Sequence, residues 1–154
     1  MAKRPKPMPL EGVGFVNDGI EAVRGLQDKT RACLREGMRF KNYRVIYKML
    51  GPMREEIRRI EIAAGNMEDC YQVKPGRSPK WYENTLDIMF IIPELDTWLN
   101  EITKELDSRH WWIVGQILKE QIAPRIKRIK VLLDEIELPT RTVPEVWYEI
   151  KNDF

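Results

Sequence analysis

The stretch from Arg109 to Leu138 constrains the fold more than any other part of the sequence, because its apolar residues keep a helical spacing throughout. Six of them recur at steps of 4, 4, 3, 4 and 3: Leu118, Ile122, Ile126, Ile129, Leu133 and Ile136. Residues at this spacing share one face of an α-helix, so the segment predicts a long amphipathic helix whose apolar face needs partners. Pro124 predicts a kink in this helix, because it removes a backbone donor and crowds the carbonyl of Glu120.

Other segments show the same spacing, and the breaks between them set the expected number of helices. Gly51-Pro52 and Gly65-Asn66 are expected to end helices, and Pro93 is expected to kink or restart one. Asp107-Ser108 should separate two long antiparallel helices. Thr142-Val-Pro-Glu145 has the pattern of a capping box for a short last helix. Strand-like alternation is absent, so we predict an all-α bundle of about five to six helices around a long kinked central helix.

The first ten residues differ from the rest, because three prolines alternate with three cations, Lys3, Arg4 and Lys6. Proline and charge together disfavour both helix and packing. We therefore expect residues 1–16 to form an extended basic N-terminal arm and residues 17–154 to form a single helical domain. Deletion of residues 2–9 is then expected to leave the unfolding temperature unchanged.

Composition limits the class of protein. With 154 residues, 43% hydrophobic and 32% charged, the chain has the size and balance of one globular domain with well-solvated helix faces. The two cysteines, Cys33 and Cys70, form no CxxC motif, and no apolar run is long enough to span a bilayer. These features predict a protein of a reducing, cytoplasm-like compartment with no membrane partner.

Charge is segregated along the chain although the formal net charge is only +2. Residues 41–60 and 119–130 each carry a local charge of +4, whereas residues 83–107 carry −6. The favoured interpretation is that acidic and basic helices lie side by side in one bundle. The alternative is that a basic face meets an acidic partner.

The loop before the third long helix joins cations to aromatic residues. Lys74, Arg77 and Lys80 are followed by Trp81 and Tyr82, a combination that can bind phosphate and stack on a base. A structural interpretation is favoured, in which Ser78 caps the helix and both aromatic side chains turn inward.

Residues for catalysis or metal binding do not cluster in the sequence. His110 is the only histidine, which excludes two-histidine metal centres, and the paired carboxylates of all-α pyrophosphohydrolases are missing. Cys70 follows Glu68 and Asp69, whose charge should raise its thiol pKa. We therefore predict no enzyme activity, no catalytic residue, no metal and no cofactor.

Two functional hypotheses follow. The first is a non-enzymatic helical subunit or adaptor of a larger protein or nucleoprotein assembly, which binds a protein partner or a second copy through apolar helix faces and the basic arm. The alternative is a nucleic-acid-binding protein that uses the arm, the 74–80 loop and the basic face of residues 119–130. The predicted contact residues for the two hypotheses are Lys3, Arg4, Lys6, Lys74, Arg77, Lys80, Trp81, Arg125 and Arg128.

Overall fold

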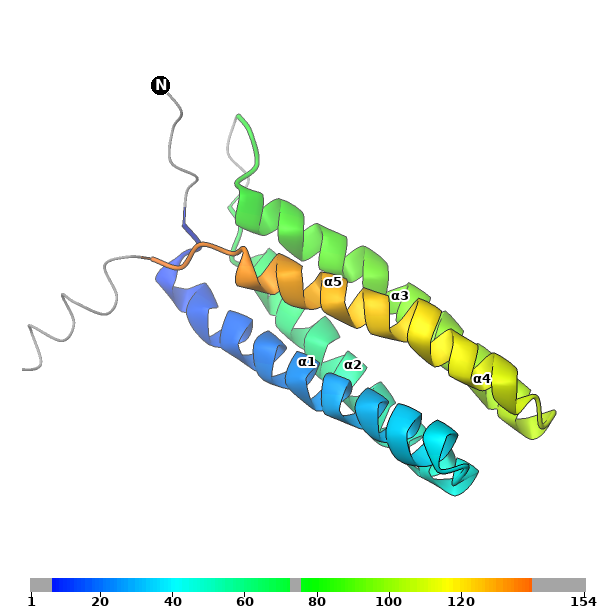
Figure 1. The fold of residues 1–154 in the computed structure, drawn as a ribbon. Helices are drawn as coiled ribbons and strands as arrows, with labels where there is room; N and C mark the ends of the chain where they lie inside the picture. The colour runs from blue at the N-terminus through cyan, green and yellow to red at the C-terminus, as the bar shows by residue number, and fades with distance from the viewer. Residues whose placement is uncertain (1–6, 73–75, 140–154) are drawn as a thin grey trace, which may run out of the picture.

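The computed structural model describes residues 7–72 and 76–139 and folds them into four helical rods that run up and down alternately in one bundle (Figure 1). No strand occurs within these two ranges. In chain order the segments are η1 (Leu10–Gly12), α1 (Val13–Ala32), the π-helical η2 (Cys33–Arg39), α2 (Tyr43–Asp69), α3 (Lys80–Asp107), α4 (Trp111–Ile117), the π-helical η3 (Leu118–Ile122) and α5 (Ala123–Asp134). The all-α prediction is confirmed.

The fourth rod consists of α4, η3 and α5, and it contains the apolar stripe that organises the sequence. All six stripe residues, from Leu118 to Ile136, are buried. The chain passes Pro124 by widening into the π-helical turn η3 immediately before it, and Pro124 then occupies the first turn of α5. A π-helical turn changes the hydrogen-bond register and so accommodates the donor that proline lacks. The predicted kink near Pro124 is not confirmed.

The expected five to six helices are not confirmed either, because three predicted breaks do not end helices. α2 continues through Gly51-Pro52 and Gly65-Asn66 as far as Asp69, and α3 continues through Pro93. Pro93 lies on the exposed side of α3, where water reaches the carbonyl that it leaves without a donor. Packing on the buried side therefore outweighs the local signals. The short helix predicted after Thr142 lies outside the described residues.

The two ends of the bundle differ. The α1–α2 turn and the α3–α4 turn lie together at one end, and the α2–α3 connection lies at the other (Figure 1). At that other end Met8 is only 1% exposed, and its backbone N–H donates a hydrogen bond to the carbonyl of Glu137 over 2.9 Å. Residues 1–6 lie outside the described residues, but the predicted arm boundary at residue 16 is corrected: the packed domain includes Met8, and α1 already begins at Val13.

Two glycines in the helices give opposite predictions for replacement by alanine. A Cβ at Gly37 would lie 2.4 Å from Cγ1 of Ile46, a β-branched side chain that cannot easily turn away, whereas a Cβ at Gly51 would meet nothing within 4 Å. We expect Gly37→Ala to destabilise the fold by about 1–3 kcal/mol. Gly51→Ala should stabilise it by about 0.5–1 kcal/mol, because alanine loses less backbone entropy. Urea unfolding of both variants tests this, and equal effects would contradict it.

Candidate partner-binding site

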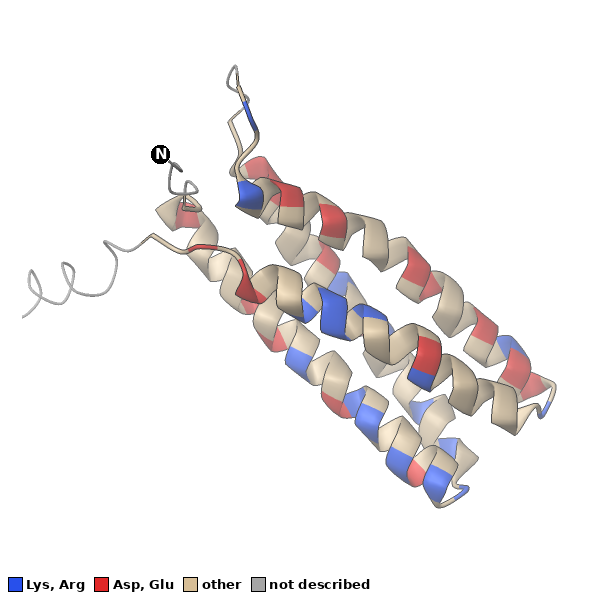
Figure 2. Cartoon of the chain, turned by 45° about the horizontal axis from the view of Figure 1, so that its top comes forward, with Lys and Arg blue, Asp and Glu red and all other residues tan. Residues whose placement is uncertain are grey.

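Ion pairs connect the acidic helix α3 to both of its neighbours, which confirms the side-by-side interpretation of the charge segments. Arg58 of α2 binds Asp96, and Nε of Arg125 in α5 lies 2.9 Å from Oε2 of Glu94. Figure 2 shows the acidic residues following α3 along its length. Exposed pairs of this kind add little stability.

The predicted contact residues do not form one surface. Arg125 is held by Glu94 and Gln121 and lies over the ring of Trp98, so its guanidinium is already occupied. Lys80, near the Arg77 loop, approaches Glu135 at 3.7 Å, while Arg128 is exposed on α5.

Trp81 requires a correction. It is 4% exposed and packs edge-on against Tyr71 and Tyr82, so it cannot stack on a base. Trp81 and Tyr82 form one small aromatic cluster with Tyr71, and packing in this cluster stabilises the inward orientation of both side chains. Lys3, Arg4, Lys6 and Lys74 lie outside the described residues.

Positive charge is more concentrated at the end of the bundle that holds the α1–α2 and α3–α4 turns than in the segments predicted to bind. Residues 29–48 contain seven cations and a single acid, Glu36, a net charge of +6. Arg109 in the α3–α4 turn adds another cation. Figure 2 shows these basic residues gathered at the far end of α1 and around its turn. We call residues 29–48 together with 109–112 the basic end.

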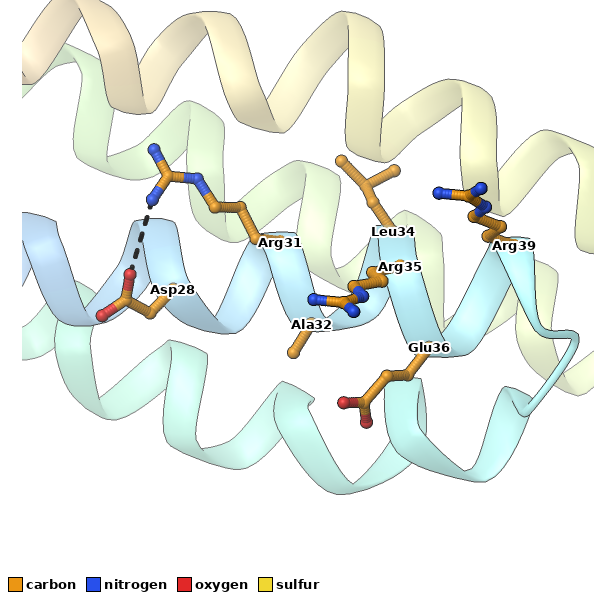
Figure 3. A pocket seen from close by; sticks show the side chains of 7 residues that line it. All are labelled: Asp28, Arg31, Ala32, Leu34, Arg35, Glu36 and Arg39. Atoms are coloured by element: carbon orange, nitrogen blue, oxygen red, sulfur yellow. Dashed lines mark ion pairs between the residues drawn. The ribbon is translucent and has the colours of Figure 1, made fainter.

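Three of the arginines at the basic end lie on the last turn of α1 and on the π-helical segment η2. An open groove in this region is lined by Ala32, Leu34 and the three arginines, Arg31, Arg35 and Arg39 (Figure 3). Asp28 approaches Arg31 at 3.6 Å, but both side chains are about three-quarters exposed, so the pair is weak. In Figure 3 Glu36 points to the opposite side of the helix from Arg31 and Arg39. The other two arginines form no ion pair with a carboxylate of the described residues.

Three aromatic side chains stand exposed at this same end. Phe40 is 63%, Tyr47 44% and Trp112 71% exposed. Beneath them the rings of Tyr43 and Trp111 stack at 4.1 Å with an interplanar angle of 8°, which joins the start of α2 to the start of α4. Large apolar rings left in water are costly unless a partner covers them.

Two carboxylates in the last turn of α3, next to the basic end, are engaged by Tyr47 and His110. Tyr47 donates a hydrogen bond to Oδ1 of Asp107 over 3.3 Å, and Nδ1 of His110 lies 2.7 Å from Oε2 of Glu105. Partial burial of the phenol, and then its bond to Asp107, raise the pKa of Tyr47. The phenol therefore remains a neutral donor at physiological pH.

Both turns at the basic end hold a cation in a strained backbone conformation. Lys41 has φ 55° and Arg109 has φ 60°, and these are the only residues other than glycine with positive φ in the described ranges. Arg109 occupies the left-handed position of a Schellman motif, in which its N–H donates to the Leu106 carbonyl and that of His110 to the Glu105 carbonyl. Glycine is the unstrained residue at such a position.

The described ranges hold no sign of metal chemistry or of a membrane span. They contain no cluster of three or more potential metal ligands, and no helix among them is long and apolar enough to cross a membrane. Burial, then the charges of Glu11 and Asp69, raise the pKa of the Cys70 thiol. The effect expected of Asp69 is thus present.

Cys33 gives a pH prediction. Burial raises its pKa from 9.0 to about 12, so the unfolded chain loses this thiol proton at lower pH than the folded one. The contribution to stability is therefore complete below pH 9.0 and is lost as the pH rises through about 12. We expect a maleimide at neutral pH to label Cys70 but not Cys33 until the chain unfolds. Peptide mapping by mass spectrometry measures this, and rapid labelling of Cys33 in the folded protein would contradict it.

Comparisons with known proteins add no relative: no family model, no curated protein and no solved structure is significantly similar to this chain.

The basic end contains residues that the sequence prediction missed, namely Arg35, Arg39, Lys41, Arg109 and Trp112. A signal existed, because the charge of residues 29–48 exceeds that of the segment 41–60. The positive φ angles and the placement of both turns at one end had no such signal. The sequence alone does not show which loops lie at the same end of the bundle.

Proposed function

We propose that the protein is a non-enzymatic helical subunit or adaptor whose contact surface is the basic end of the bundle. The observation that carries this proposal is the presence of three exposed aromatic rings among cations of which only Arg31 has a carboxylate partner, a weak one, in the described chain. Trp, Tyr and Arg are the residues that dominate binding energy at interfaces. We place this role in a reducing compartment such as the cytoplasm, which the two free thiols support.

The basic end replaces the apolar helix faces as the proposed contact surface. The apolar stripes of all four rods pack against one another in the common core, so they are not available to a partner. The alternative of nucleic-acid binding through the 74–80 loop and residues 119–130 has less support, because Trp81 is buried and Arg125 is ion-paired.

Site-specific photo-crosslinking in cells of the source organism tests the location. A photoreactive phenylalanine is placed at Trp112 or at Phe40, and a matched control is placed at Phe90. Phe90 is 74% exposed, like Trp112, but it lies on the acidic helix α3. We expect adducts from positions 112 and 40, and few from position 90.

The charge dependence completes the test. Arg39→Glu together with Arg44→Glu should abolish the adduct at position 112, since both cations are exposed at the basic end. Equal adduct yields at positions 112 and 90, or an adduct that survives the charge reversal, would contradict the proposal.

A further inference from the structure

We infer that the partner of the basic end is single-stranded nucleic acid, with Lys41 and Arg109 contacting phosphates while exposed rings stack on bases. This inference rests on the proposed contact surface and names its ligand. Three observations support it: aromatic rings and cations alternate on this surface, the rings are exposed to solvent, and the backbone is strained at Lys41 and Arg109.

The interleaving of charge and aromatic rings fits a polyanion better than a folded protein partner. The centre of a protein interface is depleted of charged residues. At the basic end Arg39 lies 5.9 Å from the ring centre of Phe40, and Lys41 follows directly. Such a surface would force a protein partner to desolvate several cations, whereas phosphates spaced along a strand neutralise them.

The exposed rings favour a single strand over a duplex. Phe40 and Trp112 are 63% and 71% exposed, and a base can stack on an exposed ring only when it is not already stacked within a double helix. Four of the seven cations in residues 29–48 are arginines, whose planar guanidinium binds phosphate through two parallel hydrogen bonds.

The strained backbone at Lys41 and Arg109 is an observation separate from the number of charges at the basic end. Both non-glycine residues with positive φ in the described chain are cations, they occupy separate turns, and the two turns lie at the same end of the bundle. Folding alone would favour glycine at each position. Retention of Lys41 and Arg109 at a cost in stability is expected when their charge serves binding.

The first experiment measures binding of the full chain to a fluorescein-labelled 20-mer of thymidylate by anisotropy. We expect binding that weakens with salt, with a slope of log K against log salt near −3, as about four phosphate contacts predict. A duplex of the same length should bind at least tenfold more weakly. Absence of binding at low salt, or equal binding of the duplex, would overturn the inference.

The second experiment removes the strained cations. Lys41→Gly with Arg109→Gly should weaken binding of the 20-mer at least tenfold while the unfolding temperature stays the same or rises. The control pair, Lys127→Gln with Lys130→Gln, removes the same charge from the exposed side of α5 and should change binding less than twofold. Equal losses from both pairs would overturn the assignment.

An acidic protein as partner gives a different outcome. Trp112→Ala should weaken binding of the 20-mer several-fold, because a stacking ring is lost, and should leave binding of poly-glutamate unchanged. If poly-glutamate binds as tightly as the 20-mer, and Trp112→Ala affects neither, the nucleic-acid inference fails. Selective crosslinking at position 112 would then still support the proposed contact surface, so the two failures are distinguishable.

Discussion

Replacement of Ile129 by aspartate is expected to unfold most of the protein. Ile129 is fully buried in the stripe of α5 and belongs to the hydrophobic core of the bundle, where water does not reach it. An unpaired buried charge costs several kcal/mol, which is comparable to the roughly 5–15 kcal/mol that holds a domain of this size together. We expect circular dichroism to show a large loss of cooperative thermal unfolding.

The neighbouring residue provides the control. Lys130 is exposed, so Lys130→Asp reverses a charge one position away without burying it. Its unfolding temperature should stay close to that of the unchanged protein. Unchanged unfolding of the Ile129→Asp variant would mean that the stripe of α5 faces water, and the core described above would be wrong.

Met8→Ala is expected to destabilise the bundle by about 2–4 kcal/mol, because a fully buried side chain is removed at the end that it closes. Leu10→Ala is the control: Leu10 is 65% exposed, and its truncation should change stability by less than about 0.5 kcal/mol. Denaturant unfolding measures both. Equal stabilities of the two variants would contradict this role of Met8.

The same contact changes the expectation for N-terminal truncation. Deletion of residues 2–9 should lower the unfolding temperature, because it removes Met8 and its hydrogen bond to Glu137. The sequence did not indicate that Met8 is buried, because a single methionine between two prolines forms no periodic apolar pattern. Burial of a single residue through a long-range contact is a tertiary property.

Helix identity was predictable from the sequence, but helix ends were not. The stripe from Leu118 to Ile136 marked the buried face correctly, because apolar periodicity reports burial directly. The prediction that Gly51-Pro52 and Pro93 interrupt helices was wrong. Each destabilises a helix locally by up to a few kcal/mol, but this is offset because the residues on either side pack into one core. The π-helical turns had no sequence signal that we could use.

The candidate site was less predictable than the fold. Contiguous charge segments drew attention to Arg125 and Lys80, yet the fold pairs both with carboxylates. The basic end depends on bringing Lys41 and Arg109 into two turns at one end, although they lie far apart in the sequence. Trp81 was a predicted contact residue because tryptophan can stack on a base, but in the structure its side chain is buried and packs within the protein.

The central claim, that the basic end is the contact surface, is tested most directly by mapping backbone amide chemical shifts while the thymidylate 20-mer is titrated into isotope-labelled protein. We predict that the largest shifts fall within residues 35–48 and 109–112. Shifts centred on residues 76–80 or on α5 would contradict it, whereas no shifts at all would overturn the assignment of single-stranded nucleic acid as its ligand.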